Sequence, residues 1–148
     1  MKGKRKPWAY FDTSVLVKRY VRESGSDRVK SLLANYRFIS SRLALVEASS
    51  TFLRRRDAQD LDARHFAAIL KRFDADRVHF ELIEPTPEVL GRAEKLARER
   101  KVRSLDAIHL ASMLCFSDST NLRIPLITAD EDQRSAGAAL SLDVIWVR

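Results

Sequence analysis

The sequence predicts an α/β fold with three layers, in which helices cover both faces of a central parallel sheet. Short apolar runs alternate with longer segments of helical periodicity from one end of the chain to the other. Strands separated by helical segments pair in parallel, because each crossover returns the chain to the same edge of the sheet. The 148 residues suit a single domain around one core, with residues 1–7 as a basic N-terminal tail.

The predicted elements follow from local pattern. Five short apolar runs are predicted as strands: residues 8–11, 38–40, 78–83, 124–128 and 142–147. Seven segments with apolar residues at three- and four-residue spacing are predicted as helices: residues 13–20, 26–36, 41–56, 61–73, 86–100, 104–116 and 131–139. Ser41 is expected to cap the third helix and Thr86 to open the fifth.

The composition limits the class of partner. A formal charge of +7 and a pI of about 9.9 favour a polyanion, either nucleic acid or an acidic protein. A single cysteine, Cys115, excludes an internal disulfide, and with three histidines it cannot build a typical structural zinc site. No segment approaches the roughly 20 apolar residues of a membrane span, and the apolar stretch behind the basic start is too short for a signal peptide. We therefore expect a cytoplasmic protein without membrane contact.

Four acidic residues stand where predicted strands end or helices begin. Asp12 ends the first strand, and Asp130 comes two residues after the fourth. Ligands of open α/β sheets bind at the carboxyl ends of the strands, so both residues are expected at one rim. Glu47 and Asp106 lie near the beginnings of helices that leave or approach that rim.

Glu47 carries the most information of the four. It is the only charged residue between positions 43 and 53. A helix that is apolar nearly all round is expected to be buried, and an unpaired carboxylate there would be costly or would take up a proton. We therefore expect a cation beside Glu47, either a metal ion or the guanidinium of one of the many arginines.

The other three acids have simpler explanations when each is considered alone. Asp12 and Asp130 precede helices and could be N-caps, whereas Asp106 follows Ser104, a possible cap, and would favour the helix dipole. Together, however, four carboxylates in one cleft repel one another unless a cation neutralises them. Oxygen ligands without His or Cys select a hard cation, Mg²⁺ or Mn²⁺. Such a metal beside a basic surface suits hydrolysis of a phosphodiester.

Four motifs resemble those of a known family. The segment 11–17, Phe-Asp-Thr-Ser-Val-Leu-Val, is similar to the opening motif of PIN-domain proteins, particularly the VapC-type toxins of prokaryotic toxin–antitoxin pairs. Segments 41–48, 103–111 and 126–130 contain the other three acids and resemble the later motifs in the same order. The resemblance spans nearly the whole chain.

The resemblance implies a PIN-like α/β/α fold and an endoribonuclease that hydrolyses RNA phosphodiester bonds through a water activated by Mg²⁺ or Mn²⁺. The catalytic, metal-binding acids would be Asp12, Glu47, Asp106 and Asp130. Residues that would support these acids or contact the phosphate are Thr13, Ser14, Thr128 and Asp132, the last as an aid or substitute for Asp130. The family also implies a homodimer and inhibition by a cognate antitoxin.

Basic residues near the motifs are candidates for RNA contacts. They are Arg54, Arg55, Arg56, Arg98, Lys101 and Arg103. The first three end the predicted Glu47 helix, where they could follow the RNA backbone or simply stabilise the helix C-terminus. The last three precede Asp106 and are better placed to guide a phosphate. His109 could carry a proton, but a buried histidine with hydrogen-bond partners is the favoured interpretation.

Other functions remain open alongside the toxin. The same fold could serve an RNA-processing nuclease without an antitoxin, or a non-catalytic RNA- or protein-binding domain. The non-catalytic domain would gain nothing from buried acids that face a phosphate, and it should show no Mn²⁺-dependent rise in melting temperature. A phosphatase with an aspartyl-phosphate intermediate needs a second Asp two residues after the first, where this chain has Ser14. The basic tail could be an RNA-contacting arm or a plain solvated segment.

Overall fold

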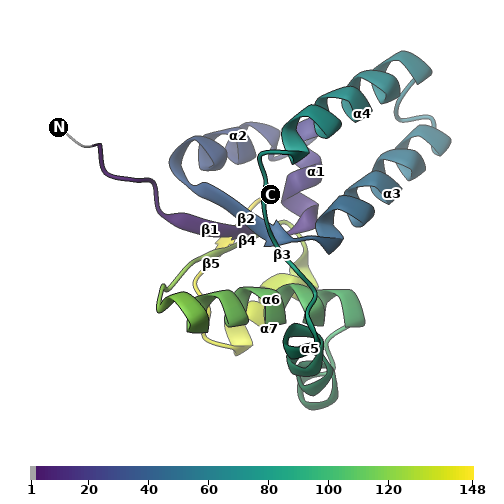
Figure 1. Ribbon diagram of the computed structural model, residues 1–148. Coiled ribbons are helices and arrows are strands. Elements are labelled where there is room, and N and C mark those ends of the chain that lie inside the picture. The colour runs from purple at the N-terminus through teal and green to yellow at the C-terminus, as the bar shows by residue number, and fades with distance from the viewer. Residues whose placement is uncertain (1–2) are drawn as a thin grey trace.

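A computed structural model describes residues 3–148, which form five strands and seven helices (Figure 1). Met1 and Lys2, at the start of the predicted basic tail, lie outside the described residues, and residues 3–7 are exposed without regular structure. The elements in chain order are β1 (Trp8–Phe11), α1 (Thr13–Tyr20), α2 (Ser26–Asn35), β2 (Arg37–Ser41), α3 (Leu43–Asp57), α4 (Ala63–Arg77), β3 (Glu81–Ile83), α5 (Pro87–Arg100), α6 (Ser104–Thr120), β4 (Leu126–Thr128), α7 (Glu131–Ala139) and β5 (Val144–Trp146).

The sheet is entirely parallel, in the order β3-β2-β1-β4-β5. The chain builds outward from β1 through β2 to β3 and then returns to the other side of β1 with β4. This reversal makes the junction of β1 and β4 the switch point, where a crevice opens at the carboxyl ends of the strands. The predicted parallel sheet is confirmed. Asp12 and Asp130, the two acids predicted to follow strands, lie at this junction.

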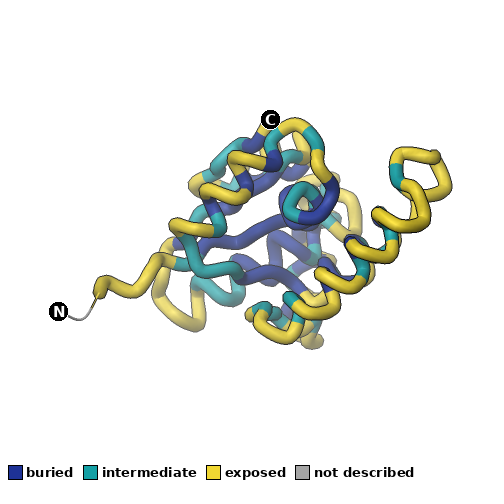
Figure 2. Tube along the Cα trace, turned by 90° about the horizontal axis from the view of Figure 1, so that it is seen from above, coloured by how far each residue is buried: buried dark blue, intermediate teal, exposed yellow. Residues whose placement is uncertain are grey.

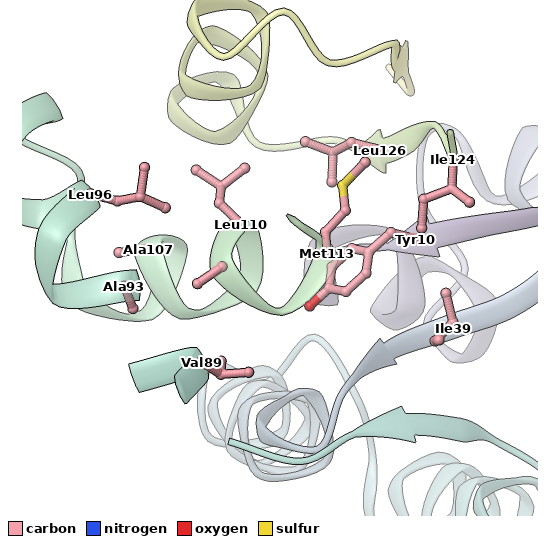
Figure 3. Close-up of a cluster of buried hydrophobic side chains, with 11 residues drawn as sticks. Tyr10, Ile39, Val89, Ala93, Leu96, Ala107, Leu110, Met113, Ile124 and Leu126 are labelled. Atoms are coloured by element: carbon pink, nitrogen blue, oxygen red, sulfur yellow. The ribbon is translucent and has the colours of Figure 1, made fainter. Parts of the chain in front are cut away.

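Helices cover both faces of the sheet, as predicted. In Figure 1, α1 and α2 lie on one side and α5, α6 and α7 on the other. Alternate residues of β1 face the two layers, because side chains of a strand point to opposite faces. Ala9 and Phe11 pack with the α1–α2 side, and Tyr10 packs with the α6 side. Figure 3 shows the Tyr10 ring beside Met113 of α6, in the same cluster as Leu110.

Helices α3 and α4 form a hairpin that projects from the body of the molecule (Figure 1). At its base, Phe52 of α3 and Phe73 of α4 pack edge-to-face with Tyr20 of α1. The connection at the tip is largely exposed (Figure 2). The prediction that the Glu47 helix is largely buried is therefore wrong. Val46 is 67% exposed and Leu53 42% exposed, because α3 packs on only one side.

Several predicted boundaries move by a few residues. Ser41 is the last residue of β2, and α3 begins at Leu43. Ser104 is the first helical residue of α6 and does not cap it. Strand β3 is shorter than predicted because α4 runs on to Arg77, and Val78, at its end, is 75% exposed. Among residues 3–148, no helix combines the length and apolar character needed to cross a membrane.

Candidate active site

The four predicted acids line one cleft at the carboxyl ends of β1 and β4. The cleft has a volume of about 580 Å³. Asp12 follows β1, Glu47 lies on α3, Asp106 in the first turn of α6, and Asp130 immediately before α7. Residues far apart in the chain thus meet as the motifs predicted, whereas their catalytic and metal-binding roles stay a prediction.

Asp12 is held in one orientation by three donors. Its side chain is nearly buried, its Oδ1 accepts a hydrogen bond from the Thr13 backbone N–H at 2.8 Å, and its Oδ2 accepts from Ser14 Oγ at 2.9 Å. Thr128 Oγ1 also donates to Oδ2, at 2.8 Å. Ser14 Oγ in turn accepts from the Ala129 backbone N–H. Asp12 therefore caps α1 and also ties β1 to β4. The hydroxyls of Ser14 and Thr128 contact it, whereas Thr13 contacts it only through its backbone N–H.

Glu47 forms a hydrogen bond and an ion pair with His109. Its Oε1 accepts a hydrogen bond from His109 Nε2 at 2.5 Å and from Thr13 Oγ1 at 2.9 Å. In the described part of the chain, no arginine forms a salt bridge with Glu47, so the arginine alternative is not supported. His109 is 1% exposed, and its Nδ1 lies 2.7 Å from the Tyr10 hydroxyl. The favoured interpretation of His109, a buried residue with hydrogen-bond partners, is confirmed.

This contact shifts the pKa of both partners. Burial is the largest single influence on the pKa of Glu47 and acts to raise it, but the hydrogen bond and charge of His109 and the hydrogen bond from Thr13 together hold the pKa below its usual value. Burial is the largest single influence on the pKa of His109 and acts to lower it, but the hydrogen bond to Glu47 and the charges of Asp12, Glu47 and Asp106 together raise it. Each partner thus favours the charged form of the other.

The environment of the acidic cleft shifts the pKa of Asp106. Burial, followed by the charges of Asp130 and Asp12, raises its pKa to about 6. It is the third residue of α6, and Ser104 supplies no cap for that helix. A first-turn acid that only favoured the helix dipole would show the opposite shift. The charges of Asp130 and Asp12 thus add to the effect of burial on the pKa of this side chain.

Asp130 has a structural role in addition to its place in the cleft. Its Oδ1 accepts a hydrogen bond from the Gln133 backbone N–H at 2.8 Å, which makes Asp130 the N-cap of α7. Gln133 is fully buried, and its Nε2 donates to the backbone oxygen of Asp106 at 3.3 Å. The cap and this hydrogen bond hold the beginnings of α6 and α7 together. The N-cap interpretation is correct for Asp12 and Asp130, and it does not exclude a place in the site.

The donor set of the cleft consists of carboxylate oxygens. Both nitrogens of His109 are engaged, and Cys115 lies elsewhere, against the α5–α6 core. Within residues 3–148, no group of three or more His, Cys, Asp or Glu side chains is arranged to hold a metal ion directly. This donor set fits a hard cation bound by one or two carboxylates and otherwise by water, which is the usual mode of Mg²⁺.

Basic side chains border the acids on one side. Arg54 and Arg55 of α3 line the same cleft, together with Lys18 of α1. Arg55 also forms ion pairs with Glu23 and Asp60. Lys18 was not among the predicted site residues, because a lysine in the last turn of a helix is commonplace.

A second pocket, of about 360 Å³, lies next to the first and shares Asp106 with it. Lys101 and Arg103 line this second pocket, and so does Asp132, which is absent from the lining of the acidic cleft. Two other predicted RNA contacts line neither pocket: Arg56 pairs with Asp57 and lies over Phe66, and Arg98 pairs with Glu94. All six RNA contacts stay predictions.

Comparison with known proteins gives the family of this fold and site. The family described as "PIN domain" matches residues 9–139. The chain belongs to the PIN-domain family. This PIN domain is 32% identical over 113 residues to Ribonuclease VapC45 and to Ribonuclease VapC49, from two strains of Mycobacterium tuberculosis. Each alignment covers 76% of this chain and 78% of the relative.

Solved structures share the PIN fold at lower identity. A toxin–antitoxin complex from Klebsiella pneumoniae matches with a TM-score of 0.60 and 20% identity, over 84% of this chain and 88% of that one. The crystal structure of PAE2754 from Pyrobaculum aerophilum matches with a TM-score of 0.60 and 17% identity, over 88% of this chain and 84% of that one. The predicted PIN-like architecture is confirmed.

One participant of the site was missed at the level of sequence. Tyr10 was read only as part of an apolar strand, yet its hydroxyl contacts both His109 and the backbone N–H of Ser41. The available signal was the residue type itself, because a tyrosine in a buried strand needs a partner for its hydroxyl.

Proposed function

We propose that this PIN domain is an endoribonuclease that hydrolyses RNA with the help of Mg²⁺ or Mn²⁺. One observation carries the proposal: four carboxylates converge in one cleft, where burial and, after it, the charges of Asp130 and Asp12 raise the pKa of Asp106 to about 6. A protein that only binds RNA has no use for such a cluster opposite a phosphate. Two relatives at 32% identity are named ribonucleases, which supports the same activity.

Asp12, Glu47, Asp106 and Asp130 would hold the metal, with direct bonds from one or two of them and water between the ion and the rest. A bound divalent cation lowers the pKa of a coordinated water and shields charge on the phosphate. The protein's own contribution is orientation. Asp12 Oδ2 is occupied by two hydroxyl donors, which leaves Oδ1 as the better placed ligand atom.

The RNA strand would cross the cleft past Asp106, between two groups of cations. Arg54 and Arg55 stand on the α3 side, and Lys101 and Arg103 stand in the second pocket beyond Asp106. Cations on both sides of the acids would hold the phosphates that flank the scissile one, since phosphate contacts position a nucleic acid without reading its sequence. Arg54→Ala and Arg103→Ala should each weaken RNA binding and reduce its salt dependence.

The biological role that the motifs favour is that of a cytoplasmic toxin, active as a homodimer and restrained by a cognate antitoxin. Its support is the resemblance of four ordered motifs to VapC-type toxins. Co-expression with the product of an adjacent small reading frame tests the partner, and analytical ultracentrifugation tests the homodimer. Growth arrest that the co-expressed partner fails to relieve would favour the RNA-processing role.

The activity is tested by RNA cleavage with Mg²⁺ or Mn²⁺ and with EDTA. Asp12→Asn and Asp106→Asn should each abolish most cleavage. Asp118→Asn is the matched control, because Asp118 lies on the same helix as Asp106 but pairs with Arg92 away from the cleft. Undiminished cleavage in both test variants, or cleavage that EDTA leaves intact, would contradict the proposal.

A further inference from the structure

A chain of buried hydrogen bonds leads from the backbone of β2 to one oxygen of Glu47. We propose that Tyr10 and His109 are positioning residues that fix Glu47 for metal binding, an inference that rests on the proposed function and deepens it. Together with Thr13 they form what we call the Glu47 clamp. None of the three needs to touch the metal or the RNA in order to act.

The hydrogen-bond chain from Ser41 to Glu47 passes through four different elements. The Ser41 backbone N–H, at the end of β2, donates to the Tyr10 hydroxyl at 3.0 Å. The Tyr10 hydroxyl, on β1, lies 2.7 Å from His109 Nδ1, on α6. His109 Nε2 lies 2.5 Å from Glu47 Oε1, on α3. The carboxylate on a projecting helix is thus tied to two central strands and to the helix on the other face of the sheet.

The order of donors in this chain depends on the contacts of the Tyr10 hydroxyl and on the protonation of His109. The Ser41 N–H occupies a lone pair of the Tyr10 oxygen, so the Tyr10 O–H is free to donate to His109 Nδ1. A histidine that accepts at Nδ1 carries its proton at Nε2, and Nε2 then donates to Glu47. A doubly protonated His109 donates from Nδ1 to the Tyr10 oxygen and still donates from Nε2 to Glu47, so the contact with Glu47 has the same direction in both states.

The geometry leaves Glu47 one oxygen for the cleft. Oε1 accepts from His109 and from Thr13 Oγ1, while Oε2 accepts no hydrogen bond from the described residues. Glu47 lines the acidic cleft and keeps 22% of its side chain exposed. A glutamate without these contacts could turn about three side-chain bonds, whereas the clamp selects one orientation. Contacts of this kind behind a metal ligand typically change metal affinity or activity by about 10- to 100-fold.

A simpler account is that Tyr10 and His109 only fill the core, since both are essentially buried. The two accounts differ in what removal of a single hydroxyl does. Tyr10→Phe keeps the ring in its packing position and removes only the hydroxyl, with its contacts to His109 and to the Ser41 backbone N–H. Tyr20→Phe is the matched control: Tyr20 is also buried and its hydroxyl donates to Asp76 at 2.8 Å, in the α1–α4 region outside the clamp.

The experiment measures Mn²⁺ binding by the metal-free protein through the rise in melting temperature along a Mn²⁺ titration, together with kcat and KM for RNA cleavage. Tyr10→Phe and His109→Leu should weaken Mn²⁺ binding by about 10- to 100-fold and lower kcat more than they change KM. Tyr20→Phe should lower the melting temperature without a change in Mn²⁺ affinity. His109→Gln, which restores a donor to Glu47, should recover part of the affinity that His109→Leu loses.

The outcomes separate the clamp from the function on which it rests. A wild-type protein that neither binds Mn²⁺ nor cleaves RNA would overturn the proposed function, and the clamp with it. A wild-type protein that does both, with Tyr10→Phe unchanged in Mn²⁺ affinity and kcat, would overturn the clamp alone. Cooperative melting of Tyr10→Phe shows that this variant is folded. The test then stands on Tyr10→Phe even if His109→Leu does not fold.

Discussion

Replacement of Asp106 by Asn is expected to stabilise the metal-free protein at neutral pH. Burial, then the charges of Asp130 and Asp12, raises the pKa of Asp106 from 3.8 to about 6 in the folded protein. Between these pH values the folded state holds the proton more tightly than the unfolded chain does. Stability therefore falls as the pH rises from about 4 to about 6, and above that the charged carboxylate exerts its full destabilising effect.

The size of the effect follows from the shift and from the exposure of the side chain. A shift from 3.8 to about 6 corresponds to roughly 3 kcal/mol for a fully buried group. Because Asp106 is only partly buried, solvent screening reduces this to about 1–2 kcal/mol. The favourable interaction of a first-turn acid with the dipole of α6, about 0.3–1 kcal/mol, opposes it. A net gain of about 1 kcal/mol would raise the melting temperature by about 2–4 °C in a domain of this size.

Scanning calorimetry in EDTA at pH 7.5 and below pH 4 measures this effect. The gain of Asp106→Asn should be present at the higher pH and absent at the lower one, where the wild-type carboxyl is protonated. Asp143→Asn is the control with the opposite expectation, because Arg123 lowers the pKa of the exposed Asp143. A lower melting temperature for Asp106→Asn at pH 7.5 would show that Asp106 is a structural acceptor and would refute the repulsion argument.

Three further changes test the packing around the site. Asp130→Ala should lower the free energy of unfolding in urea by about 1 kcal/mol, because the Gln133 N–H loses its cap. Asp130→Asn should retain most of the stability, and equal losses in the two variants would contradict the capping role. Gly137→Ala should cost about 1–3 kcal/mol, since a Cβ there would lie 2.9 Å from Leu126 Cδ2; an unchanged midpoint would mean that α7 can move off β4. Phe52→Ala, at a fully buried position, should cost about 3–5 kcal/mol in the same assay.

The element order and the placement of the acids at one rim could be predicted from the sequence. Strands and helices alternate in a local pattern, and Asp12 and Asp130 follow directly on apolar strands. Parallel strands bring their carboxyl ends to one edge, so a position relative to a strand already implies a position in space. Caps are also local, which is why the N-cap interpretation of Asp12 and Asp130 holds.

The exposure of a helix face was not predictable in this way. The segment around Glu47 reads as apolar nearly all round, yet Val46 and Leu53 are exposed because α3 projects in a hairpin with α4. The direction in which Asp132 faces was not predictable either. It is two residues from Asp130 in the chain but lines the neighbouring pocket. Two residues of helix turn a side chain through about half a circle, and the packing of α7 decides which way each faces.

The sequence by itself determined that Glu47 needs a compensating partner, since a charge in such a segment is costly to desolvate. The tertiary structure alone decided that this partner is His109, 62 residues away, and that Tyr10 stands behind it. Periodicity records which side chains avoid water, because that preference belongs to each residue. A hydrogen bond between side chains of different elements depends on distance and direction, and those exist only after β1, α3 and α6 have packed around the same sheet.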